Sequence, residues 1–62
     1  MKYSLIGVDG NAFCIMNYVS TCMKKEDKTD EEVNAYFEKA TRGDYHELVC
    51  VSQDMIEKLN QN

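Results

Sequence analysis

The sequence predicts a small α+β protein, mostly helical, in which one N-terminal strand is followed by three helices. Three observations lead to this prediction: a β-type run over residues 2–8, three later segments with helical spacing of apolar residues, and capping residues before those segments. The 62 residues make one small domain, residues 1–62, near the lower limit at which a chain folds without cross-links. We therefore expect oligomerisation to add stability.

The first predicted element is a strand over residues 2–8, followed by a turn into a helix. The strand contains Tyr, Leu, Ile and Val, which are enriched in β-structure. The turn consists of Asp9, Gly10 and Asn11, and either Asp9 or Asn11 can cap the next helix by accepting a backbone N–H. That helix covers residues 12–25, and its apolar positions extend beyond a single stripe, which predicts burial on several sides.

The second helix has a clear start signal. Thr29 and Glu32 have the spacing of a capping box, in which the Thr hydroxyl and the Glu carboxylate each accept a backbone N–H. The helix is predicted to run to about Thr41. Gly43 then stands where a left-handed C-terminal cap residue is expected.

The third helix is predicted to start after Asp44, with Glu47 three residues later. Residues 48–51 fit a strand as well as a helix by propensity. The helical spacing of apolar residues continues to Leu59, so we favour a helix. Residues 60–62 are expected to fray.

A single strand leaves its backbone hydrogen-bonding groups without partners. Pairing with the same strand of a second copy across a two-fold axis would satisfy them and would cover the surplus apolar surface of the first helix. The sequence therefore predicts a homodimer. The candidate interface residues are Tyr3, Leu5, Phe13 and Tyr18.

The chain is acidic, with a formal net charge of −4. Eight of its 11 acidic side chains lie in residues 26–47. An acidic surface disfavours binding to phosphate backbones, so no direct nucleic-acid binding is expected. The acidic segment indicates a solvated helix face, a protein partner with a basic face, or mimicry of nucleic acid, and the solvated face is favoured on composition. No apolar run approaches the ~20 residues of a membrane span, so no membrane insertion is expected.

The three cysteines are expected to be free thiols in a reducing cytosol. Cys14 and Cys22 would lie about 12 Å apart in one helix, at 1.5 Å per residue, which is beyond disulfide reach. The single histidine, His46, has no Cys or His at ligand spacing, and no C-x-x-C pair is present. We expect no metal and no cofactor.

The chain resembles a group of short proteins from Gram-positive bacteria, their plasmids and their phages, at residues 5–13, 15–16, 31–33, 35–36 and 40–45. These proteins have a similar "DGNAF" turn and a later "SGDY" turn. The resemblance implies a cytoplasmic, possibly phage-encoded protein of mobile-element type and brings no activity with it. This chain departs from the pattern at Arg42 and in the charged connector of residues 24–30. The second candidate turn comprises Arg42, Gly43, Asp44 and Tyr45.

No catalytic constellation emerges from the residues, so an enzyme is not expected. His46 lies beside Asp44 and Glu47, but adjacent side chains at a helix start mostly point apart and no nucleophile is tied to His46. The preferred hypothesis is a non-enzymatic, homodimeric interaction protein that binds another protein, for example to inhibit a host or defence protein. The alternative is a nucleotide or anion binder that uses the strand-turn-helix junction at residues 7–13.

Overall fold

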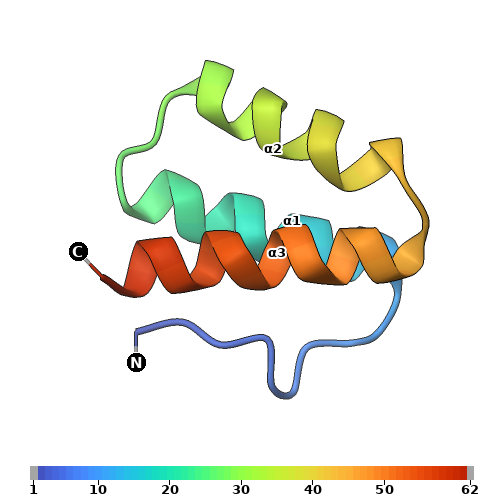
Figure 1. Cartoon of the computed structure of the whole chain (residues 1–62). Helices are drawn as coiled ribbons and strands as arrows, with labels where there is room; N and C mark the ends of the chain where they lie inside the picture. Colours follow the sequence, from blue (N-terminus) through green and yellow to red (C-terminus); the bar gives the residue numbers. More distant parts are fainter. Residues whose placement is uncertain (1, 62) are drawn as a thin grey trace.

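The computed structural model describes residues 2–61, and within them the chain forms three α-helices. These are α1 (Ala12–Lys25), α2 (Asp30–Arg42) and α3 (Tyr45–Asn60). Figure 1 shows α1 and α3 side by side and pointing the same way, while α2 lies over them and runs in the opposite direction. The result is a three-helix bundle whose consecutive helices are antiparallel.

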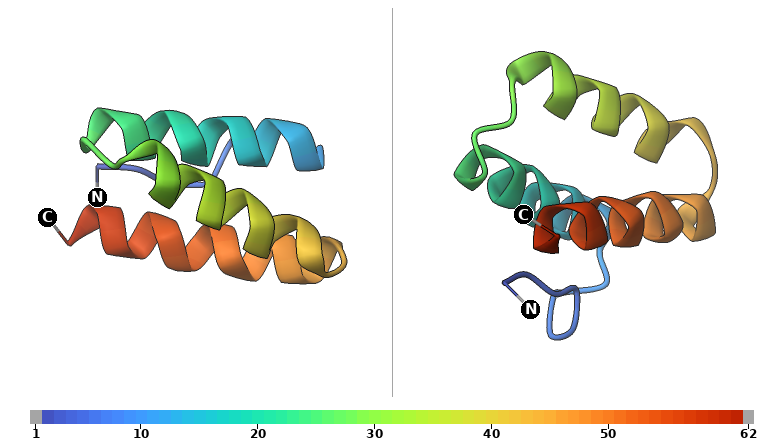
Figure 2. Two further views of the ribbon diagram at one scale, coloured as in Figure 1. Left: turned by 90° about the horizontal axis from the view of Figure 1, so that it is seen from above. Right: turned by 60° about the vertical axis from the view of Figure 1, so that its left-hand side comes forward.

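The predicted α+β fold is wrong, because residues 2–61 contain no strand. Residues 2–11 instead form an irregular segment. This segment runs along the α1 and α3 pair on the face opposite α2, as the right-hand view of Figure 2 shows. The helix pair is therefore covered on both faces, by α2 on one and by the N-terminal segment on the other.

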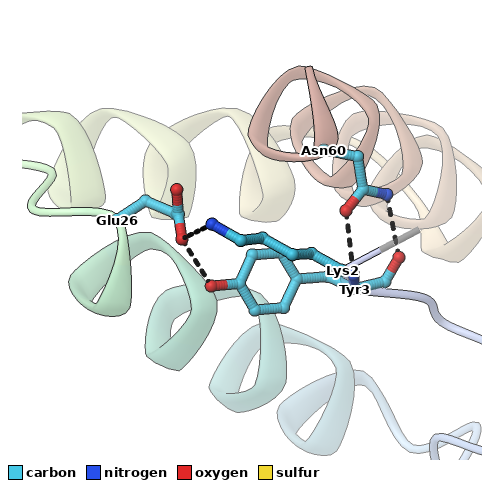
Figure 3. A network of polar contacts seen from close by, with 4 residues as sticks. All are labelled: Lys2, Tyr3, Glu26 and Asn60. Atoms are coloured by element: carbon cyan, nitrogen blue, oxygen red, sulfur yellow. Dashed lines mark hydrogen bonds and ion pairs between the residues drawn. The ribbon is translucent and has the colours of Figure 1, made fainter. Parts of the chain in front are cut away.

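Side chains of the bundle bind the backbone of the N-terminal segment, so a partner strand is not required. The Asn60 side chain accepts the Tyr3 N–H at 2.8 Å and donates to the Tyr3 carbonyl at 2.8 Å (Figure 3). The Ser4 N–H donates to the Tyr18 hydroxyl at 3.1 Å. Because buried backbone polar groups need partners of any kind, these bonds replace the sheet that the strand would have joined. The predicted pairing of strands 2–8 across a two-fold axis is therefore wrong, since residues 2–8 form no strand.

A tight turn interrupts the β-type run. The Val8 N–H donates to the Leu5 carbonyl at 3.1 Å, and Gly7 has a φ of 86°. A positive φ at the third position is typical of a type II turn and favours glycine. Gly7 therefore reverses the chain at a point where a strand of residues 2–8 would have had to continue.

The core forms where the three helices meet. Tyr36 of α2 is 2% exposed, and its hydroxyl shares a 2.6 Å hydrogen bond with the buried Ser52 hydroxyl of α3. This bond satisfies two polar groups that would be costly to bury unpaired. The apolar core residues are Ile15, Val19, Cys22, Met23, Val33, Tyr36, Ala40, Leu48, Ile56 and Leu59.

The predicted helix starts are confirmed. Asn11 caps α1 by accepting the Phe13 N–H at 2.9 Å. Thr29 accepts the Glu32 N–H at 3.2 Å, and the Glu32 carboxylate accepts the Thr29 N–H at 3.1 Å, which completes the capping box. Asp44 accepts the Glu47 N–H at 3.0 Å at the start of α3. Residues 48–51 are helical, as favoured.

Helix α1 ends at Lys25, as predicted, whereas the end of α2 differs from expectation. α1 ends in a Schellman motif, in which the Lys28 N–H bonds the Met23 carbonyl at 3.0 Å and Asp27 adopts a left-handed φ of 62°. The left-handed cap predicted at Gly43 is wrong, because its φ is −112°. Glycine is needed there for space: an added Cβ would lie 2.7 Å from Glu47 Cγ.

The end of α3 also differs. Asn60, predicted to fray, lies within α3 and holds Tyr3. Gln61 follows it in a turn, and Asn62, part of the same prediction, lies outside the described residues.

The capping box gives the first prediction. Replacing Thr29 with Ala should lower the free energy of unfolding by about 1 kcal/mol, because the Glu32 N–H at the start of α2 loses the Thr29 hydroxyl as its partner. Thr21→Ala is the matched control, since the exposed Thr21 hydroxyl bonds the Asn17 carbonyl within α1 and caps no helix. Urea unfolding measures the free energy of unfolding of both variants. Equal losses at the two positions would contradict the capping role of Thr29.

The contacts of Glu26 give a pH prediction. The Tyr3 hydroxyl donates to the Glu26 carboxylate at 2.7 Å, and Lys2 Nζ lies 3.0 Å from the same oxygen (Figure 3). The Tyr3 hydrogen bond, followed by that from Lys2, lowers the pKa of Glu26 below its ordinary 4.5. The same carboxylate raises the pKa of Tyr3 from 10.0 to about 12.

Tyr3→Phe removes this link and should destabilise the protein at neutral pH. The stability difference from wild type should shrink as the pH falls below 4.5, because the pKa of Glu26 is lowered by folding and its contribution is lost on protonation. It should shrink again as the pH rises from 10 toward 12, where Tyr3 ionises. Urea unfolding of both proteins across this range measures the difference. A stability difference between the two proteins that stays constant across this pH range would contradict the stabilising role of the hydrogen bond between Tyr3 and Glu26.

Candidate functional site

The two turns singled out from the sequence meet in space. The Tyr45 hydroxyl at the start of α3 donates a hydrogen bond to the carbonyl of Gly10, which precedes α1. This bond joins the turn of Asp9, Gly10 and Asn11 to the turn that begins at Arg42. We call the joined pair the two-turn junction; it consists of residues 9–11 and 42–45.

The first turn uses its own side chains to bind its backbone. Asp9 Oδ1 accepts the Asn11 N–H at 2.9 Å, and Asn11 Oδ1 accepts the Phe13 N–H at 2.9 Å. These N–H groups are the ones that a phosphate at a helix start would need. Asp9 also places a carboxylate at this point. The arrangement is therefore that of a capped helix start. The N–H groups of Asn11 and Phe13, which an anion would need as donors, already have partners.

The second turn is compact. Gly43 lies close to the Glu47 side chain, and Asp44 caps α3. Arg42 is the exposed last residue of α2. Tyr45 remains 52% exposed although its hydroxyl is bonded. The turn thus presents an aromatic ring and a cation at the surface.

An apolar hollow of about 300 Å³ lies next to the two-turn junction. Phe13 is 73% exposed at this hollow, which makes it one of the most exposed large apolar side chains of the described chain. We call this feature the Phe13 hollow. It is lined by Ala12, Phe13, Met16, Ala40, Thr41, Gly43, Asp44, Tyr45 and Leu48.

The four candidate interface residues fall into two groups. Tyr3 and Tyr18 use their hydroxyl groups within the chain, and Leu5 is partly buried against the core. Phe13 is left exposed. The structure therefore separates Phe13, which is available to a partner, from three residues that anchor the N-terminal segment.

A Cys and His pair was missed in the sequence. Cys50 Sγ lies 3.7 Å from His46 Nε2 on the exposed surface of α3. The spacing of four residues, which places two side chains on one helix face, could have revealed it. Cys14 and Cys50 are exposed free thiols, whereas burial raises the pKa of the free Cys22 thiol. Within residues 2–61 no group of three or more metal-ligating side chains gathers.

Comparison with known proteins gave no assignment: no family model matches the chain, and no match was found among curated proteins or solved structures. In the described part of the chain, none of the helices has the length and apolarity needed to cross a membrane.

The bond between the two turns gives a third prediction. Tyr45→Phe keeps the ring beside the Phe13 hollow and removes the hydroxyl that bonds the Gly10 carbonyl. It should lower the free energy of unfolding by about 1 kcal/mol, the usual net value of one hydrogen bond. It should also speed amide exchange at Asn11. Urea unfolding and hydrogen exchange measure these effects, and wild-type behaviour in both would contradict a structural role for the bond.

Proposed function

We propose that this chain is a non-enzymatic interaction protein that forms a homodimer through the Phe13 hollow and binds another protein as a dimer. The observation that carries the proposal is the exposure of Phe13, at 73%, beside an apolar hollow of about 300 Å³. Exposed aromatic side chains grouped with apolar surface are typical of protein interfaces.

A second copy is the partner that best fits this surface. A protruding ring and a hollow lie next to each other on the same face. A two-fold axis could therefore place Phe13 of each copy in the hollow of the other, which is the self-complementary arrangement of an isologous dimer. Burial of two aromatic rings would also supply the stability that a short chain needs.

The charge distribution supports a second, different protein partner. Asp30, Glu31 and Glu38 are exposed on α2, within the acidic segment of residues 26–47. A dimer would carry two such surfaces, which favours a partner with a basic face. The resemblance to proteins of mobile elements fits a cytoplasmic role in inhibiting a host or defence protein.

The alternative of a nucleotide or anion binder at residues 7–13 has less support. The N–H groups of Asn11 and Phe13 already bond Asp9 and Asn11, respectively. A ligand would have to displace these side chains and tolerate the Asp9 carboxylate. We therefore prefer the interaction protein.

Sedimentation tests the dimer. At micromolar concentration the wild type should give about 14 kDa, twice the 7.2 kDa chain mass. Phe13→Ser should give the monomer mass with little loss of stability, because the ring is exposed in the single chain. Ile6→Ser is the matched control: Ile6 is 88% exposed and does not line the hollow. A monomeric wild type, or dimer loss in the control alone, would contradict the proposal.

A further inference from the structure

A second hollow, separate from the Phe13 hollow, lies between α2 and α3. Its volume is about 420 Å³. Its apolar lining includes Met23 and Tyr36, both buried in the core, and the partly buried Met55. Clefts of this size with mostly apolar walls are typical of small-molecule sites. We call this feature the lysine groove, for the charged residues at its edge.

The edge of this groove is cationic in an acidic protein. Three of the seven Lys and Arg residues of the chain line it, namely Lys28, Lys39 and Lys58, against the two carboxylates of Glu32 and Asp54. Among residues 2–61, no carboxylate lies within ion-pairing distance of these three lysines. The groove is therefore locally positive, although the net charge of the chain is −4.

The two carboxylates leave the groove with an excess of one positive charge. The Glu32 carboxylate accepts the Thr29 N–H at 3.1 Å, at the same end of the groove as Lys28. Asp54 lies one turn before Lys58 on α3, and the two groups form no ion pair. Figure 1 shows that α2 and α3 run in opposite directions. Lys28, before the start of α2, and Lys58, near the end of α3, therefore lie at the same end of the groove.

The groove extends along the direction of the helices. Residues 32–39 of α2 and 51–58 of α3 line its two sides, so each side extends for about 10 Å at 1.5 Å per residue. Met55 is partly buried at the groove and its flexible side chain adapts to a range of apolar shapes, while the buried Met23 lies at the floor. A single alkyl chain fits such a site better than a compact or planar ligand.

We propose that the lysine groove binds a free aliphatic carboxylate, with the alkyl chain along the Met55 side chain and over the buried Met23 at the floor, and the carboxylate between Lys28 and Lys58. The apolar walls supply affinity in proportion to chain length. The lysines select an anion over a cationic or neutral amphiphile of the same length.

Methyl NMR of protein labelled at methionine tests this proposal with decanoate, below its micelle concentration, as the probe. Saturable shifts are expected for the Met23 and Met55 methyl groups and not for Met16, which lines the Phe13 hollow. Octanoate should bind about 15-fold more weakly, because two methylenes fewer are buried. Decyltrimethylammonium should not saturate these sites at the same concentrations.

The double variant Lys28→Glu/Lys58→Glu should bind decanoate about tenfold more weakly, since the charges of the half-buried Lys28 and the exposed Lys58 are both reversed. Lys24→Glu/Lys25→Glu is the control, because it makes the same change in net charge at exposed lysines that do not line the groove. Both variants should keep the wild-type helix content by circular dichroism.

Four results would overturn the proposal: no saturable shift with decanoate, a shift confined to Met16, equal shifts with the cationic amphiphile, or equal affinity losses in the two double variants. None of these results depends on the dimer proposed above, because the Phe13 hollow contains neither the two methionines nor the two lysines.

Discussion

The bond between the Asn60 side chain and the backbone of Tyr3 is the interaction on which the arrangement of this chain depends. The Asn60 side chain accepts the Tyr3 N–H at 2.8 Å and donates to the Tyr3 carbonyl at 2.8 Å, and these two hydrogen bonds hold the N-terminal segment against the end of α3. Through them the N-terminal segment covers the face of α1 and α3 that α2 leaves open. A chain of 62 residues has little core to spare, so this cover matters more here than in a larger domain.

Local signals were sufficient to predict the helices. Asn11, Thr29 and Asp44 each accept a backbone N–H at a helix start, and this chemistry depends on residues no more than three apart. The extent of α1 and the helix over residues 48–51 follow in the same way from the spacing of apolar residues. Such features could be read from the sequence because their partners are close along the chain.

The N-terminal segment could not be predicted in this way, because its partners are distant in sequence. The β-type composition of residues 2–8 is real, yet Gly7 turns the chain and Asn60 supplies the hydrogen bonds that a strand would have needed. Asn60 itself was expected to fray at the end of α3. In the same way, the two turns were identified separately, whereas the Tyr45 bond that joins them and the hollow beside them emerged only from the fold.

Helix α2 takes part in both hollows. Ala40 and Thr41 line the Phe13 hollow, whereas Tyr36 and Lys39 line the lysine groove. Binding at two sites that share a helix is coupled when that helix can adopt two alternative arrangements and each site favours one of them. The buried hydrogen bond between Tyr36 and Ser52 fixes α2 against α3 at the floor of the groove, and moving α2 would leave both hydroxyl groups unpaired in the core. A ligand that fills the groove without breaking this bond therefore leaves Ala40 in place, and self-association through the Phe13 hollow and binding in the lysine groove are expected to be independent.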